Sequence, residues 1–310
     1  MIATITLNPS IDQFIIVENL VTDDANRAKE IFREAGGKGV NVSKVITELK
    51  GPTHAYALKG GLSGSLWENL LRRIRIPFTA MEIHGDTRIN TILTDIKKHT
   101  QTRISAPGPC VSQKDLDKFL KRLLAARPRP FLWALGGSLS AGMKNSTYRD
   151  FVSALQKNGT PCILDTDNEA LRLGIQAKPY AIKPNEHEIQ RLCNKKLSTI
   201  EDYLKAAGRL VEKGIRIVIV SLGAKGALFV TKEKAFHVLT PRVPVKSKVG
   251  AGDSLIGGFS LGLYRRMDFQ KAACLGVAAS TSAVMTEGVR LCRREDIPRL
   301  LPRIKVRPLT

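Results

Sequence analysis

The sequence predicts a doubly wound α/β fold: a mainly parallel sheet flanked by helices, with a small second sheet. Short β-branched runs alternate with amphipathic stretches along most of the 310 residues, and this alternation is typical of βαβ units. Residues 13–32 and 87–104 break the rhythm, because strand-like residues there are interleaved with polar ones. We therefore expect one domain over residues 1–310, with a β-sheet lid formed by these two segments.

The individual elements follow from the period of the apolar residues. Short runs rich in β-branched residues predict strands at residues 2–7, 55–58, 131–135, 162–165, 180–182 and 215–220. Amphipathic stretches predict helices near residues 40–49, 65–74, 114–125, 148–157 and 200–213. Two further helices are expected at residues 251–265 and 269–285, and a basic tail follows them.

Charge and composition indicate which classes of partner and which cellular location are compatible with the sequence. The 49 Lys and Arg outnumber the 28 Asp and Glu, giving a formal charge of +21, so the surface should attract polyanions such as nucleic acid, acidic membrane or phosphorylated metabolites. The five cysteines include no C-x-x-C pair, which favours reduced thiols and a cytoplasmic location. No basic start resembles a signal peptide and no apolar run approaches about 18 residues, so we expect no membrane partner.

The strongest local signal is Gly250-Ala251-Gly252-Asp253, directly before an apolar helix. The glycines allow close approach of the backbone to a ligand, and the free N–H groups of a first helical turn bind anions. A carboxylate in such a place repels a bound phosphate unless it faces an incoming hydroxyl. Asp253 is thus a candidate base and the 250–252 turn a candidate anion hole for phosphoryl transfer. The structural alternative is that Asp253 only complements the helix N-terminus.

A second glycine-rich turn, Gly36-Gly37-Lys38-Gly39, precedes a helical stretch that carries Asn41. Alone it is weak evidence, since such turns often only pack a helix against a strand. The chain has neither a G-x-x-x-x-G-K-[ST] segment nor a G-x-G-x-x-G fingerprint. A P-loop NTPase and a dinucleotide-dependent dehydrogenase therefore lose their main sequence support.

Taken in order, these segments resemble the pfkB family of carbohydrate kinases, which has a ribokinase-like fold. The matching segments are Asn8-Pro9-Ser10-Ile11-Asp12, 36–42, Thr87-Arg88-Ile89-Asn90, 183–188, 220–226 and 249–254. They cover the chain nearly end to end. Within the family they look most like the phosphosugar branch, which contains 1-phosphofructokinase, tagatose-6-phosphate kinase and the minor 6-phosphofructokinase.

On the sugar side, the resemblance implies a set of substrate-binding residues: Asp12, Gly37, Lys38, Asn41 and Ser138 for the sugar, and Arg88 and Arg27 for its phosphate. Guanidinium suits a dianionic phosphate because it offers two parallel charged hydrogen bonds. The family's usual Ser-Gly-Ser-Leu-Pro stands here as 136–140 with Gly136 in place of the first serine. This departure bears on which sugar is bound.

On the nucleotide side, the resemblance implies that Lys183, Asn185, Ser221, Gly223 and Gly226 bind ATP. Asn185 and Glu188 match an N-x-x-E element that organises Mg²⁺ through water, in keeping with the waters that this ion retains. Asn185 is also a good helix N-cap with Glu188 at N3. Both roles can hold together.

The expected function is ATP-dependent phosphorylation of fructose 1-phosphate or fructose 6-phosphate to fructose 1,6-bisphosphate. Tagatose-6-phosphate kinase is the alternative enzyme. Between the two phosphofructokinases, the glycine turn and the 87–90 segment favour 1-phosphofructokinase, whereas the 286–292 segment looks nearer to the minor 6-phosphofructokinase. A non-catalytic sugar-phosphate sensor would need neither a base nor a metal site. Because only 5% of the residues are aromatic and no RNA-binding signature is present, we expect no specific nucleic-acid partner. The family resemblance implies a homodimer formed through the lid.

Overall fold

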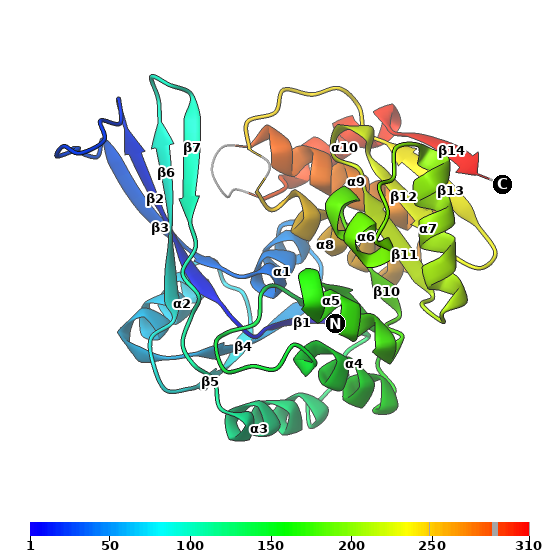
Figure 1. The fold of residues 1–310 in the computed structure, drawn as a ribbon, viewed down its shortest axis with the longest axis horizontal. Coiled ribbons are helices and arrows are strands. Elements are labelled where there is room, and N and C mark those ends of the chain that lie inside the picture. The colour runs from blue at the N-terminus through cyan, green and yellow to red at the C-terminus, as the bar shows by residue number, and fades with distance from the viewer. Residues whose placement is uncertain (248, 287–290, 310) are drawn as a thin grey trace.

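The computed structural model describes residues 1–247, 249–286 and 291–309 (Figure 1). Within these residues a large sheet contains β1 (Ile2–Thr6), β4 (Thr53–Lys59), β5 (Phe78–Glu82), β8 (Leu132–Gly136), β9 (Cys162–Asp165), β10 (Ala181–Ile182), β11 (Ile217–Ser221), β12 (Ala227–Val230), β13 (Ala235–Leu239) and β14 (Lys305–Leu309). Their order is β14-β13-β12-β11-β10-β9-β8-β1-β4-β5. Neighbours from β5 to β11 are parallel, and β12, β13 and β14 extend the sheet antiparallel.

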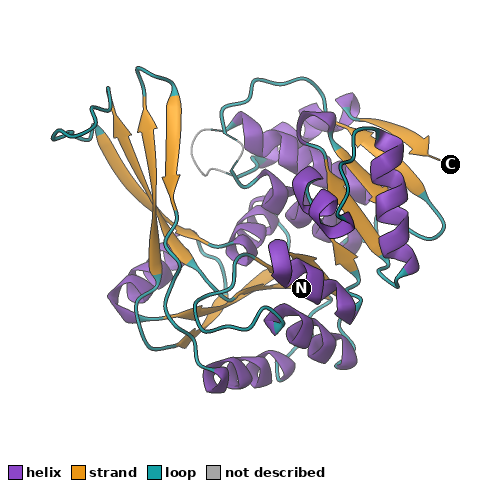
Figure 2. Ribbon diagram, viewed as in Figure 1, coloured by secondary structure: helices purple, strands orange, loops and turns teal. Residues whose placement is uncertain are grey.

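Helices cover both faces of this sheet (Figure 2). They are α1 (Lys38–Glu48), α2 (Gly61–Arg73), α3 (Gln113–Leu124), α4 (Thr147–Lys157), α5 (Asn168–Gly174), α6 (Glu186–Cys193), α7 (Ile200–Glu212), α8 (Ala251–Tyr264), α9 (Phe269–Met285) and α10 (Ile297–Leu300). Short 3₁₀ turns are η1 (Ile175–Ala177), η2 (Gly223–Lys225), η3 (Arg294–Asp296) and η4 (Leu301–Arg303). One face packs against α3 to α7 and the other against α1, α8, α9 and α10.

Alternation along the strands explains the two layers. In β8, Trp133 and Leu135 enter one core, while Leu132 and Ala134 enter the other. Both sets are buried, so successive side chains of a parallel strand point to opposite covered faces. The predicted doubly wound arrangement is therefore correct, and the predicted strand at residues 162–165 coincides with β9.

Four strands of the large sheet lie outside the predicted elements: β5, β12, β13 and β14. The run in β12 is only four residues and entirely buried, so it shows no alternation. In β14 the alternation is masked by charge, since the Lys305–Leu309 strand is mostly exposed at the edge of the sheet. Within the described residues no helix is long and apolar enough to cross a bilayer.

A second sheet contains β2 (Ser10–Val17), β3 (Glu30–Gly36), β6 (Arg88–Asp95) and β7 (Thr100–Ile104), in the order β3-β2-β6-β7. It stands upright beside the α/β body (Figure 1). Its inner face carries a stacked pair, Phe14 and Phe32, with ring centroids 4.7 Å apart. Ile92 and Val249 pack against this pair, so the sheet touches the segment that leads into α8.

Candidate active site

A hollow of about 980 Å³ opens at the carboxyl ends of β1, β8, β9, β10 and β11, beneath the second sheet. These five strands are consecutive neighbours in the large sheet. In open α/β sheets, ligands bind outside the carboxyl ends of the strands. Most of the predicted site residues line this one hollow: Asp12, Gly37, Lys38, Asn41, Arg88, Ser138, Lys183, Asn185, Glu188, Ser221, Gly250, Gly252 and Asp253.

Asp253 lies in the first turn of α8. The turn begins at Gly250, whose φ of 75° favours glycine, and an added Cβ there would come within 2.2 Å of Leu291. Asn41 of α1 donates a hydrogen bond of 2.8 Å to Asp253 Oδ2, which fixes the carboxylate at the floor of the hollow. Burial raises the pKa of Asp253, and the positive charge of Lys38 only partly offsets that effect.

Two lysines flank a buried carboxylate at the centre of the site. Asp165, the last residue of β9, is 3% exposed, and its Oδ1 lies 3.1 Å from Lys38 Nζ and 3.3 Å from Lys183 Nζ. Burial favours the neutral acid, but Lys183 and Lys38 outweigh it and hold the pKa of Asp165 below its ordinary value. For Lys38 burial opposes the charge, yet Asp165 and Asp253 raise the pKa of Lys38.

This arrangement places both ammonium groups next to the candidate base. Gly252 supports it, since an added Cβ would meet Lys183 Nζ at 3.1 Å. The glycine therefore lets the lysine lie close to the first turn of α8. Positive charge and free N–H groups at one point suit a group that becomes more anionic during reaction.

The opposite wall belongs to the second sheet. Asp12 of β2 is buried, and its Oδ1 accepts hydrogen bonds from the Ser10 hydroxyl at 2.9 Å and from Asn90 Nδ2 at 2.7 Å. Gly36 must lack a side chain here, because an added Cβ would come within 2.5 Å of Asp12 Oδ2. The carboxylate is thus held ready to accept hydrogen bonds from sugar hydroxyls.

Arg88 enters the same wall from the start of β6. It donates hydrogen bonds to the carbonyl oxygens of Ala106 at 2.9 Å and Asn8 at 3.1 Å. Its Nε is buried and has no hydrogen-bond partner among the described residues. Burial lowers the pKa of Arg88, and the charge of Asp12 opposes that shift.

On the nucleotide side, Asn185 forms the capping box predicted for it. Its Oδ1 accepts hydrogen bonds from the N–H groups of His187 and Glu188, both 2.9 Å, and Glu188 Oε2 accepts one of 2.7 Å from the N–H of Asn185. Burial raises the pKa of Glu188. The structure therefore shows the capping role, and the metal role stays a prediction.

Four predicted residues do not line the hollow itself. Ala251 is the first residue of α8, and Gly223 and Gly226 form the turn after β11. Gly226 fits there because an added Cβ would come within 2.0 Å of the Val238 carbonyl. Arg27 is exposed in the segment between β2 and β3, so its contact with substrate stays a prediction.

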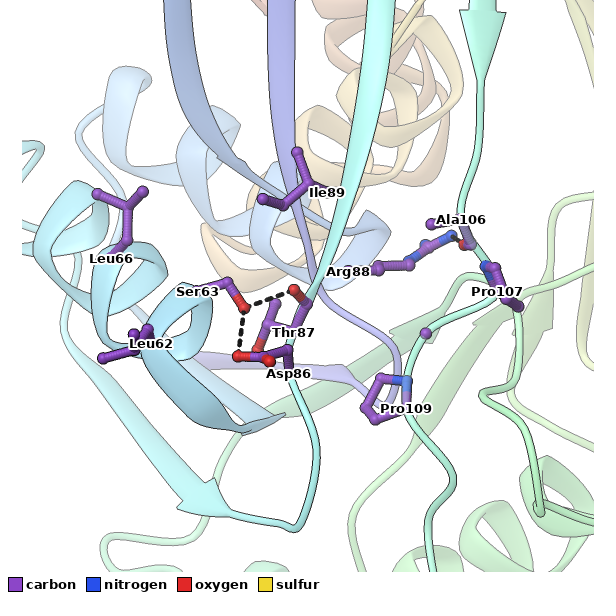
Figure 3. Close-up of a pocket in the computed structure, with 11 residues that line it drawn as sticks. Leu62, Ser63, Leu66, Asp86, Thr87, Arg88, Ile89, Ala106, Pro107 and Pro109 are labelled. Atoms are coloured by element: carbon purple, nitrogen blue, oxygen red, sulfur yellow. Dashed lines mark hydrogen bonds between the residues drawn. The ribbon is translucent and has the colours of Figure 1, made fainter.

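A second hollow, of about 680 Å³, lies at the base of the second sheet, between α2 and β6 (Figure 3). Ser63 donates hydrogen bonds to the Thr87 carbonyl at 2.7 Å and to Asp86 Oδ1 at 3.3 Å, which ties α2 to the start of β6. Arg88 extends away from this wall toward Ala106 (Figure 3). These contacts fix the base from which Arg88 reaches the first hollow.

The chain matches the family model described as "pfkB family carbohydrate kinase" over residues 5–296. The chain belongs to the pfkB family. It is 32% identical over 306 residues to a 1-phosphofructokinase of Bacillus subtilis, covering 99% of both chains. It is 32% identical over 301 residues to the ATP-dependent 6-phosphofructokinase isozyme 2 of Escherichia coli, covering 96% of this chain and 97% of the other.

A crystal structure of phosphofructokinase-2 from Escherichia coli in complex with potassium superimposes with a TM-score of 0.93 at 32% identity, over 97% of this chain and 98% of that one. This likeness confirms the expected ribokinase-like fold and the pfkB resemblance. The 286–292 segment resembles the minor 6-phosphofructokinase in sequence. Its residues 287–290 lie outside the described residues.

Two functional candidates were not predicted. Asp165 is an acidic residue at the carboxyl end of a predicted parallel strand, and that position was a usable signal. Asn90 was recognised only as part of a motif, and its contact with Asp12 depends on the register that pairs β2 with β6. Asp12 lies opposite Asn90 in that register, which no local pattern specifies.

Proposed function

We propose that this pfkB family member is a phosphofructokinase. It transfers the γ-phosphoryl group of ATP to a hydroxyl of fructose 1-phosphate or fructose 6-phosphate, giving fructose 1,6-bisphosphate. The observation that carries the proposal is the meeting of Asp253, Lys38 and Lys183 at the start of α8, facing Asp12 and Arg88 on the second sheet. The relatives named above support the substrate class.

In this mechanism Asp12 orients the sugar through its hydroxyls, and Arg88 holds the phosphate already present. Asp253 accepts the proton of the attacking hydroxyl as the O–P bond forms. The N–H groups of the 250–252 turn, with Lys38 and Lys183, stabilise the charge on the moving phosphoryl group. The raised pKa of Asp253 makes it a better proton acceptor than an ordinary aspartate.

The nucleotide would lie along Lys183, Asn185, Ser221 and the turn with Gly223 and Gly226. No group of three or more metal-ligating side chains occurs among the residues that the structure describes. A single carboxylate such as that of Glu188 is nevertheless enough for Mg²⁺, because this ion is usually bound by one or two carboxylates together with waters and phosphates. Glu188 and Asn185 would hold it through water, and the ion would neutralise phosphate charge.

We also propose that residues 1–310 form one kinase domain whose second sheet acts as a lid, formed by about 13–32 and 87–104. Its inner face already contacts Val249, next to the anion hole. Movement of this sheet would open the hollow for substrate and exclude water during transfer. Five unpaired cysteines and the use of ATP fit a cytoplasmic enzyme.

The outer face of the lid suits a homodimer. The side chains of Ile31, Ile89 and Ile104 lie on the face of the second sheet opposite Phe14 and Ile92. They are 56%, 43% and 63% exposed, respectively. A sheet face that exposes several large apolar residues is typical of an interaction surface.

We expect the double substitution Ile31→Asp and Ile104→Asp to convert a dimer into a monomer in light-scattering mass measurements. Ile74→Asp, which alters an isoleucine of similar exposure at the end of α2, should leave the mass unchanged. A wild-type monomer would contradict the proposal.

We expect Arg88→Ala to raise KM for the sugar phosphate about tenfold or more, because it removes a charged partner of the phosphate. KM for ATP should change less than about twofold, since Arg88 lies on the sugar side. Steady-state kinetics with each substrate varied in turn measures both values. An equal rise in the two KM values would refute the placement of the acceptor phosphate.

Initial rates of ADP release identify the substrate. The panel is Mg-ATP with fructose 1-phosphate, fructose 6-phosphate, tagatose 6-phosphate, and free fructose and tagatose. We expect one fructose phosphate to have the highest kcat/KM. A higher value for tagatose 6-phosphate would make the protein a tagatose-6-phosphate kinase. ATP binding without turnover of any sugar would indicate a sensor.

A further inference from the structure

His237 is a buried polar residue of β13 that lines neither hollow. It is 5% exposed. Phe236 and Val238, on either side of it, enter the core that contains α8 and α9, so the imidazole points to the opposite face of the sheet. Its partners in register on that face are Leu228 in β12 and Arg307 in β14. A buried imidazole in such a place needs a hydrogen-bond partner.

The partner is a backbone carbonyl of the turn that follows β11. His237 Nε2 lies 2.7 Å from the carbonyl oxygen of Lys225, the last residue of η2. A carbonyl oxygen can only accept, so Nε2 carries the proton and donates it. Burial lowers the pKa of His237, and the charge of Arg307 adds to that shift while the Lys225 carbonyl opposes it. The neutral ring, with its proton on Nε2, is therefore the form present at neutral pH.

The turn that accepts this hydrogen bond is the one predicted to bind ATP. It is closed by hydrogen bonds of 3.0 Å from the N–H of Lys225 to the Leu222 carbonyl and from the N–H of Gly226 to the Gly223 carbonyl. Among the residues that the structure describes, no carbonyl accepts a hydrogen bond from the exposed N–H groups of Gly223 and Ala224. These two donors are thus free for the oxygens of a ligand.

Strand β13 holds the turn at two adjacent residues. At Gly226 the two backbones are so close that an added Cβ would come within 2.0 Å of the Val238 carbonyl. The hydrogen bond from His237 fixes the neighbouring peptide unit. Without such a bond the two glycines, with φ of 55° at Gly223 and 91° at Gly226, would leave the turn with conformational freedom that ligand binding must remove.

We propose that His237 is a positioning residue for the nucleotide. Through its hydrogen bond to the Lys225 carbonyl, it holds the 223–226 turn in the conformation that binds ATP. His237 touches no substrate itself, and its effect reaches the nucleotide through the turn alone. The inference rests on the proposed use of ATP at this turn.

His237→Ala and His237→Gln test the inference, and His54→Ala is the matched control. Glutamine keeps an N–H donor of similar reach, whereas alanine removes it. His54 is a partly buried histidine of β4 whose Nε2 lies 2.9 Å from Thr79 Oγ1, near the other edge of the large sheet. All variants are full-length, and binding is measured well below the lowest of their unfolding midpoints.

In calorimetry, His237→Ala should raise Kd for Mg-ATP about five- to tenfold, the effect of one lost hydrogen bond. KM for ATP should rise by a similar factor. KM for the phosphosugar, and kcat at saturating ATP, should stay within about twofold. His237→Gln should bind ATP within about twofold of the wild type, and His54→Ala should bind it as the wild type does.

If His237→Ala binds ATP as tightly as His54→Ala does, the role of His237 is refuted and the proposed function stands. The inference is also overturned if His237→Gln binds as weakly as His237→Ala, or if KM for the phosphosugar rises as much as KM for ATP, because the histidine then supports the fold and not the turn. If the wild type binds ATP and phosphorylates no sugar, the proposed function fails while the calorimetric comparison still decides the inference. A wild type that does not bind ATP contradicts both.

Discussion

Asp253→Asn should lower kcat by on the order of a thousandfold or more while ATP still binds. Asparagine has nearly the same shape and can still accept the hydrogen bond from Asn41, but it cannot take a proton from the attacking hydroxyl. General-base catalysis and correct positioning together account for an effect of this size. Single-turnover phosphoryl transfer and calorimetric ATP binding measure the two quantities.

The same substitution should leave the unfolding midpoint unchanged or raise it. The raised pKa of Asp253 means that folding disfavours its charged form at neutral pH, and a neutral amide removes that cost. In the wild type, kcat/KM should fall as the pH drops through the raised pKa of Asp253. This loss begins at a higher pH than an ordinary aspartate, with a pKa of 3.8, would give.

Asp268→Ala is the matched control for the helix-terminal role. Asp268 is the N-cap of α9 and accepts a 2.9 Å hydrogen bond from the N–H of Lys271, on an exposed part of the molecule. Its loss should lower the unfolding midpoint modestly, because a helix cap is removed, and leave kcat unchanged. A normal kcat in Asp253→Asn would mean that Asp253 only complements its helix, as Asp268 does.

Asp165→Asn should lower kcat about a hundredfold and also destabilise the fold. It leaves Lys183 buried without its counter-charge and releases Lys38. Removing one partner of a buried ion pair costs about 3–5 kcal/mol, and a displacement of about 1 Å in a positioned group can cost a hundredfold in rate. Urea unfolding and kcat measured well below the unfolding midpoint separate the two effects.

The pH dependence of stability supplies a second test of Asp165. Its pKa is lowered in the folded state, so its contribution is complete above the ordinary pKa and is lost as the pH falls through the lowered value. Asp296→Asn controls for general destabilisation, because Asp296 is also buried and accepts a 2.6 Å hydrogen bond from Ser282 away from the hollow. If both variants lose stability yet keep normal kcat, Asp165 is a structural residue only.

Much of the site could be predicted because its residues lie in short local motifs. The Gly250–Asp253 turn and the Asn185–Glu188 capping box are fixed by adjacent residues, and the structure places both at helix starts. The doubly wound core is similarly predictable, since most of its central strands are short runs rich in apolar and β-branched residues. Local sequence chemistry and local geometry agree in these segments.

The remainder depends on pairing between distant segments. Asp165 meets Lys38 only because β9 ends, and α1 begins, at the same edge of the sheet. His237 reaches the Lys225 carbonyl only because β13 pairs with β12 in one register, and a shift by one residue would turn it to the opposite face of the sheet. Such contacts are tertiary, so residue spacing along the chain could not reveal them.

The most direct test of the account is phosphorus NMR of the purified protein with Mg-ATP and each fructose phosphate. We predict that the γ-phosphate signal of ATP is lost as ADP and the second phosphate signal of fructose 1,6-bisphosphate appear in equal amounts. Release of inorganic phosphate alone, or unchanged ATP with every phosphosugar, would contradict transfer to a sugar hydroxyl.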